Sequence, residues 1–281
     1  REYDMLKMII LSNHCDITIL LQKNKHGESL FTNVFGLDDF VIIQLILENI
    51  KMNPSDLLVK DNNGDTFLHK LARMSFDQIQ AQKHYNLEEF LEKMDKIINS
   101  NMCSKELFLE TNNDGDTFIL INPYLLKNVL NSNYCTKELI MHSNNVGDNI
   151  LNEICFKYPT YLKMLLDSQY FNSLLLIERN KLTGINLLSY ISSNLMGDLL
   201  DTMLNSNVMT DDLINYLDEF GMTPLSYTVI SKSICNVQRL INSKFDLTKS
   251  FTYNYNGKNL LIMAIMNCDD VLDTIINSKY M

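Results

Sequence analysis

Two kinds of apolar segment alternate along the chain, and both have the spacing of helices. Segments of the first kind follow a polar turn, as in residues 222–229 and 258–265. Segments of the second kind carry apolar pairs one helical turn apart, as in residues 161–162 and 165–166. This spacing puts one apolar stripe on each helix, and the stripe must be buried against a neighbour. The pattern therefore predicts pairs of helices packed side by side.

Glycine marks the start of each of these units. Seven of the nine glycines are at residues 27, 64, 115, 147, 184, 221 and 257, and four of the six intervals between them are 36 or 37 residues. A fixed period of this size is typical of a solenoid, in which each repeat contacts only its neighbours. We therefore expect a single array over residues 1–281.

The residues around the glycines predict a turn followed by the start of a helix. Asn and Asp precede the glycine, as in residues 61–64 and 218–221. Both residue types tolerate left-handed backbone angles, which glycine adopts without strain. Thr66 and Thr223 then stand where a helix N-cap is expected, and Pro224 follows at a position that needs no N–H.

A third element recurs between the second helix and the next turn. The second helix ends in Asn-Ser, at residues 99–100, 131–132, 205–206, 242–243 and 277–278. After this pair, Ser or Thr stands shortly before an acidic residue and Leu, as in Cys-Ser-Lys-Glu-Leu (103–107) and Cys-Thr-Lys-Glu-Leu (135–139). This order is typical of a capped single helical turn.

The chain resembles ankyrin repeat proteins, most closely in Asp-Glu-Phe-Gly-Met-Thr-Pro-Leu (218–225) and Asp-Asn-Asn-Gly-Asp-Thr-Phe-Leu-His-Lys-Leu-Ala (61–72). The resemblance extends over essentially the whole chain, as seven units and a partial one at residues 1–23. It implies an all-α solenoid of about seven helix-turn-helix repeats joined by hairpin-like loops. The long period and the Asn-Ser-x-x-Cys-Ser/Thr-Lys-Glu-Leu connection are similar to the divergent, mimivirus-like ankyrin proteins of giant DNA viruses of amoebae.

The repeats within residues 60–145 are irregular. The interval between the second and third repeat glycines is 51 residues, which places about 14 extra residues around 75–86. The next interval is 32 residues and predicts shortened helices within 119–132, with Pro123 at the start of the second helix. We expect a bend or a local loosening of the stack in this region.

Charge and composition narrow the class of partner. The net charge is −10 and Lys and Arg do not cluster, which argues against nucleic acid because such surfaces depend on cations that contact phosphates. No apolar run approaches the roughly 20 residues that span a bilayer. Six cysteines without a pairing pattern favour a reducing, intracellular compartment, the host cytoplasm if the viral resemblance holds. The chain begins with Arg in mid-repeat, as a trimmed or internal fragment would.

The chemically active residue types do not form an enzymatic pattern. His69 occupies the position at which the ankyrin pattern uses histidine to cap and pack the first helix, so we expect a structural role. Cys15, Cys103 and Cys135 share one repeat position, and equivalent positions in packed helices lie about 10 Å apart, too far for a disulfide or a shared metal. The sequence predicts no catalytic, cofactor or metal site. A cryptic active loop in the insertion, with His84, is the remaining enzymatic alternative.

One row of residues is the best candidate for a partner-binding site. In ankyrin folds the position four residues past each N-cap faces the concave groove. Its occupants here are Asn33, Lys70, Ile121, Glu153, Tyr190, Tyr227 and Met263. The last three would form an aromatic and apolar ladder, which Phe220 and Tyr255 at the turn tips extend. Tyr is frequent at interface hot spots, and ordinary packing between repeats is the alternative for this row.

The sequence thus predicts a non-catalytic module or adaptor that binds a host or viral protein through its concave face and turn tips. Solenoids present extended surfaces of this kind and need no cofactor. The alternative is a structural subunit of a larger viral particle or complex, without a free ligand. That alternative rests on an apolar end with Ile275, Ile276, Tyr280 and Met281, because a free solenoid normally covers its ends with polar residues. The oligomeric state stays open.

Overall fold

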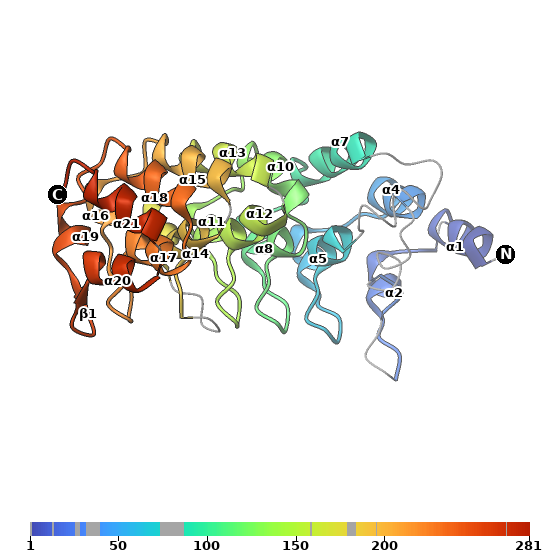
Figure 1. Ribbon diagram of the computed structural model, residues 1–281. Coiled ribbons are helices and arrows are strands. Elements are labelled where there is room, and N and C mark those ends of the chain that lie inside the picture. Colours follow the sequence, from blue (N-terminus) through green and yellow to red (C-terminus); the bar gives the residue numbers. More distant parts are fainter. Residues whose placement is uncertain are drawn as a thin grey trace. The chain divides into compact units, whose positions relative to one another are not determined.

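The computed structural model describes residues 2–12, 14–25, 29–31, 40–73, 87–157, 159–178, 184–194, 196–267 and 269–281. They form two compact units, Arg1–Asn145 and Val146–Met281. In each unit helices stack side by side, and hairpin-like loops extend from one side of the stack (Figure 1). The predicted insertion with His84 lies outside the described residues, as do Gly27 and Asn33.

The second unit repeats one order of elements: an inner helix, an outer helix, a short connecting turn and a hairpin. The inner helices are α12 (Ile150–Lys157), α14 (Leu187–Ser193), α17 (Pro224–Ile230) and α20 (Leu260–Asn267). The outer helices are α13 (Leu162–Leu166), which follows η3 (Pro159–Tyr161), α15 (Gly197–Leu204), α18 (Ile234–Ile241) and α21 (Asp269–Ile276). The connecting turns are η4 (Ser173–Leu176), α16 (Asp211–Ile214) and α19 (Thr248–Thr252). Strands β1 (Asn254–Tyr255) and β2 (Lys258–Asn259) pair antiparallel in the last hairpin.

The core of this unit lies between the two layers of helices. Inner helices pack on inner helices in the order α14, α17, α20, and outer helices pack in the order α13, α15, α18, α21. Leu188 and Leu225 of the inner layer and Met203 and Leu240 of the outer layer are fully buried. Burial of these side chains is the main stabilising contribution, and it requires the neighbouring repeat to be present.

The first unit has the same elements with less regular helices. Its outer helices are α1 (Glu2–Ile10), α4 (Phe40–Asn49), α7 (Leu87–Ile98) and α10 (Leu126–Leu130), which follows η2 (Pro123–Leu125). Its described inner helices include α5 (Phe67–Ala72) and α9 (Phe118–Ile121). The connecting turns are α2 (Ile17–Leu21), η1 (Pro54–Leu58), α8 (Lys105–Leu109) and α11 (Lys137–Met141). The short glycine interval is taken up here by the four-residue α9 and by Pro123, which opens η2.

The connecting turns are capped as the sequence predicts. In each of three turns a hydroxyl Oγ accepts a hydrogen bond from the N–H three residues later: Ser104 from Leu107 at 3.2 Å, Thr136 from Leu139 at 3.1 Å and Thr210 from Leu213 at 3.3 Å. Each bond satisfies an N–H that the helix start leaves without a partner. The recurrent Ser or Thr of this element is therefore a confirmed cap.

The Asn-Ser pair closes the outer helix with its two side chains. The Asn277 amide donates to the carbonyl of Asp273 at 2.8 Å, and the Asn99 amide donates to the carbonyl of Asp95 at 3.1 Å. The Oγ of the following serine can accept from the N–H two residues on, as Ser132 does from Tyr134 at 3.2 Å. Side chains of these types favour such local bonds, which explains why the pair recurs at helix ends.

His69 joins the first helix of its repeat to the next repeat. It is fully buried. Its Nδ1 accepts from the Thr66 N–H at 3.2 Å, and its Nε2 lies 2.9 Å from the carbonyl oxygen of Asp116. A carbonyl can only accept, so Nε2 carries the proton and the ring is neutral. The predicted structural role of His69 is confirmed.

Stability is expected to fall as the pH drops below neutrality because of this histidine. Burial lowers the pKa of His69 below its ordinary value of 6.5. Below 6.5 the unfolded chain therefore binds a proton that the native ring does not, and the native state loses stability until the lowered pKa is reached. Urea unfolding of wild type and His69→Gln at pH 7.5 and pH 5.5 tests this: the wild type should lose more free energy than the variant. Equal losses would show that His69 does not contribute.

Candidate protein-binding surface

The tips of the hairpins are turns closed by one acidic or amide side chain. Asp218 Oδ1 accepts from the N–H of Phe220 at 2.9 Å and from the N–H of Met222 at 3.0 Å. Gly221 takes the left-handed angle that the turn needs, with φ +70°. In the first unit the Asp61 carboxylate accepts from Asn63 and Asp65 in the same way, at 2.8 and 2.9 Å. The Asp-x-x-Gly pattern thus fixes the direction in which each tip points.

Tyr227 fastens the inner helix α17 to the hairpin that precedes it. Its hydroxyl donates to Asp218 Oδ2, while Oδ1 of the same carboxylate closes the turn. In the first unit the equivalent pair is Lys70 and Asp61, which form a salt bridge. The position four residues past the N-cap therefore holds its own hairpin in place. This role was not predicted from the sequence. Its sequence signal is an acidic residue at the turn and a hydrogen-bond donor nine residues later.

The phenol of Tyr227 is half-buried beside a carboxylate. Burial, followed by the hydrogen bond to Asp218 and the negative charge of Asp218, raises the pKa of Tyr227 well above its ordinary value. The phenol therefore stays protonated and keeps its hydrogen bond.

Aromatic side chains lie across the tips of the neighbouring hairpins. A Cβ on Gly184 would lie 2.6 Å from Glu219 Oε1 and 3.0 Å from Phe220 Cζ, so these two side chains rest directly on that glycine. One hairpin further, a Cβ on Gly221 would lie 3.8 Å from Cε1 of Tyr253. Phe220 and Tyr253 nevertheless stay 45% and 40% exposed. Exposed aromatic side chains held in place are typical of binding surfaces.

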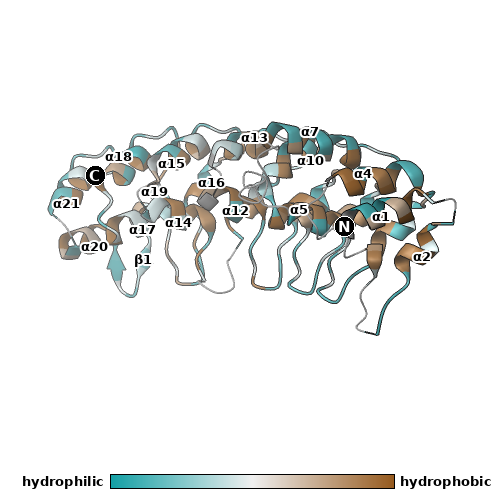
Figure 2. Ribbon diagram, turned by 90° about the vertical axis from the view of Figure 1, so that its right-hand side faces the viewer, coloured by the Kyte–Doolittle hydropathy of each residue, from teal (hydrophilic) through white to brown (hydrophobic). Residues whose placement is uncertain are grey.

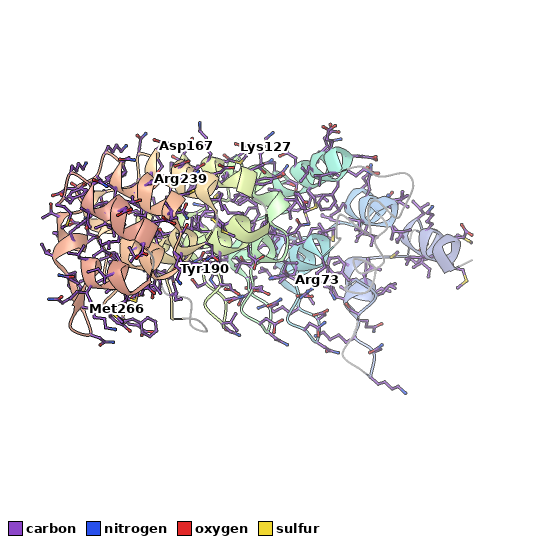
Figure 3. All side chains as sticks on the ribbon, in the orientation of Figure 1. Arg73, Lys127, Asp167, Tyr190, Arg239 and Met266 are labelled. Atoms are coloured by element: carbon purple, nitrogen blue, oxygen red, sulfur yellow. The ribbon has the colours of Figure 1, made fainter. Side chains whose placement is uncertain are left out.

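The hairpin face of the second unit is defined here as Tyr190, Phe220, Tyr227, Tyr253 and Tyr255. Tyr190, Tyr227 and Tyr255 are half-buried, and Phe220 is exposed. In Figure 3 Tyr190 and Met266 lie toward the side from which the hairpins extend, and Asp167 and Arg239 lie on the outer side. Tyr253 was not predicted as a binding residue, because it precedes its hairpin and does not occupy the tip.

Met263, by contrast, does not reach this surface. It is only 4% exposed, because α20 turns this position toward its neighbours. Met266, one turn later on α20, is 61% exposed and presents a thioether to solvent instead. The prediction that Met263 continues the exposed row of Tyr190 and Tyr227 is therefore wrong.

The similarity of this chain to known proteins lies in its fold. No protein-family model and no curated protein matches the sequence. The ankyrin repeat domain of Bcl-3, a unique member of the IkappaB protein family, is similar in structure with a TM-score of 0.63 and 13% identity, over 90% of this chain and 100% of that domain. The chain has the ankyrin-repeat fold. EF0377, an ankyrin repeat protein, has a TM-score of 0.51 and 15% identity, over 73% of this chain and 98% of its own.

The predicted all-α ankyrin solenoid is thereby confirmed, and its hairpins can be compared between the units. In the first unit asparagine joins successive ankyrin hairpins: the Asn113 N–H and Nδ2 donate to the carbonyls of Asn63 and Asn62 at 2.9 and 3.0 Å. Asn145 Nδ2 donates to the Asn113 carbonyl at 3.0 Å. Among the residues described there, these tips carry polar side chains and no Phe or Tyr. The aromatic tips belong to the second unit.

Three of the described cysteines, Cys103, Cys135 and Cys155, are buried in unreactive surroundings. Burial raises the pKa of Cys103, Cys135 and Cys155 to about 12. Over the part of the chain that the structure describes, no three His, Cys, Asp or Glu side chains converge on a position for a metal ion. In the same part no helix is long and apolar enough to cross a bilayer.

Thiol labelling is expected to separate one cysteine from three. In a Cys15→Ser/Cys268→Ser background, Cys235 is exposed while Cys103, Cys135 and Cys155 are buried. A thiolate is the reacting species, so thiols with a raised pKa react slowly. Ellman's reagent at pH 8 should label one thiol rapidly in the native protein and four after unfolding. Rapid labelling of several native thiols would contradict the described core.

Proposed function

We propose that this chain is a non-catalytic ankyrin module that binds a protein partner through the hairpin face of its second unit. The observation that carries the proposal is the pair Phe220 and Tyr253, which stay exposed while Phe220 packs over Gly184 and Tyr253 lies near Gly221 of the neighbouring hairpins. Such side chains lose little conformational freedom on binding, which is why preorganised aromatic residues give affinity. Ankyrin folds in general serve as protein–protein interaction modules.

The class of partner is narrowed by composition. A net charge of −10 disfavours nucleic acid. The narrower resemblance to ankyrin proteins of giant viruses rests on the connecting segments, and it would make the partner a host or viral protein inside an infected cell. The proposal therefore assigns the chain to recognition of another protein, without a cofactor.

Affinity purification with matched baits tests the proposal. The wild-type chain and Phe220→Ala/Tyr253→Ala, of equal thermal stability, are used beside a Leu174→Ala control, because Leu174 is 56% exposed on the connecting turn η4. A protein recovered with wild type and control but lost with the double variant supports recognition through the hairpin face. Equal recovery with all three baits excludes this site.

A second candidate function is that of a structural subunit, and the last repeat favours it. Ile265 and Ile276 are 58% and 48% exposed, whereas the equivalent Val229 and Ile241 of the preceding repeat are 0% and 5% exposed. An apolar end was predicted from Ile275, Ile276, Tyr280 and Met281. Ile275 is fully buried and does not contribute to the exposed apolar surface. Sedimentation velocity distinguishes the functions: a concentration-dependent assembly that Ile265→Glu abolishes would favour the structural subunit.

A further inference from the structure

The inner helices beside the hairpin face carry no charge. The segments α14, α17 and α20 contain no Asp, Glu, Lys or Arg, whereas each of the outer helices α15, α18 and α21 contains at least one. Figure 2 shows α20 largely in brown, with the hairpin next to it in teal. A surface without charge forms no ion pairs, and its exposed aliphatic side chains favour a partner that brings apolar side chains.

Two exposed apolar residues of these helices, Ile230 and Met266, lie on the same face as the tyrosines. Ile230 follows Tyr227 by three residues on α17, and residues three apart share one face of a helix. Ile230 is 41% exposed. On α20 the residue at the same distance past the N-cap is Met266, which is 61% exposed. The hairpin face is thus continuous with an apolar surface along two inner helices.

The hairpin at residues 218–221, which borders this surface, is acidic. Glu219 is exposed, and the two carboxylate oxygens of Asp218 hold the turn and the Tyr227 hydroxyl. Both carboxylates stand beside the aromatic side chains of Phe220 and Tyr227.

From this arrangement we infer that the hairpin face selects a protein segment in which Lys or Arg flanks apolar side chains. A cation can contact Phe220 or Tyr253 through the ring face and a carboxylate of Asp218 or Glu219 through its N–H groups. The apolar side chains beside that cation would lie on Tyr190, Ile230 and Met266. The inference rests on the proposed function, because it names the chemistry of the partner at the same surface.

Selection from a random peptide display library tests this inference without a known partner. Wild type is expected to enrich peptides that combine Lys or Arg with aromatic or aliphatic residues. Against a chosen peptide, Glu219→Lys should weaken the Kd about tenfold and reduce its salt dependence, since a charge at the edge of a site acts mainly through screened attraction. The matched control is Asp198→Lys, which reverses an exposed acid on the outer helix α15 and should leave the Kd unchanged.

Three other results would contradict the inference, and they separate it from the proposed function. Enriched peptides that are neutral or acidic but lose binding with Phe220→Ala would overturn the basic preference and leave the hairpin face in place. If the enriched peptides bind the Phe220→Ala variant with the same affinity as wild type, the hairpin face is not the binding site and both proposals fail. The same holds if wild type enriches no peptide.

Discussion

Asn215→Leu is expected to lower the free energy of unfolding by about 3 kcal/mol, the cost of leaving the buried Ser250 N–H and the part-buried Asp246 carbonyl unpaired. Asn215 is 7% exposed and joins two successive connecting turns. Its Nδ2 donates to the Asp246 carbonyl at 2.6 Å, and its Oδ1 accepts from the Ser250 N–H at 3.0 Å. Leucine fills the volume but leaves the carbonyl and the N–H without partners.

Urea unfolding followed by circular dichroism measures this loss. The matched control is Asn207→Leu, because Asn207 is an exposed residue in the turn between α15 and α16. The control should change the free energy by less than about 0.5 kcal/mol, as surface substitutions generally do. Equal effects of the two variants would show that Asn215 does not link the repeats.

Phe220→Ala/Tyr253→Ala is expected to weaken binding of the native partner roughly 30-fold, about 2 kcal/mol, the size of a hot-spot loss. Phe220 packs over Gly184, Tyr253 lies near Gly221, and the two side chains are 45% and 40% exposed. Their removal takes away contact area that was already ordered before binding. Isothermal titration with the purified partner measures the change in Kd.

Two single variants complete the measurement. Tyr227→Phe removes the hydroxyl that holds Asp218 and keeps the ring. It should weaken binding less than the double variant, because it loosens the hairpin without removing contact area. Leu174→Ala should have no effect. A double variant that binds as tightly as wild type would contradict the assignment of Phe220 and Tyr253 to the interface.

The architecture could be predicted from the sequence because each of its parts is specified locally. The turn at Asp218 needs an acceptor and then a residue that tolerates a positive φ, and Asp and Gly supply them within four residues. Thr223 caps α17 through a bond from the Ser226 N–H at 3.2 Å, again within four residues. Signals of this kind repeat at a fixed period, so a single chain shows them several times.

The candidate site could be predicted only in part because it depends on contacts between repeats. The position of Tyr227 was identified, but its bond to Asp218 crosses nine residues and two elements. The burial of Met263 depends on how α20 packs, which residue spacing along one helix does not determine. The contact between Phe220 and Gly184 joins residues 36 positions apart, so no pattern within one repeat predicts it.

The measurement that tests the central claim most directly is hydrogen exchange of the chain with and without its captured partner. Binding through the hairpin face should protect backbone amides of the second unit in residues 184–190, 216–227 and 253–259. The outer helices α15, α18 and α21 should exchange as they do in the free chain. Protection confined to these outer helices, or to the first unit, would contradict the account.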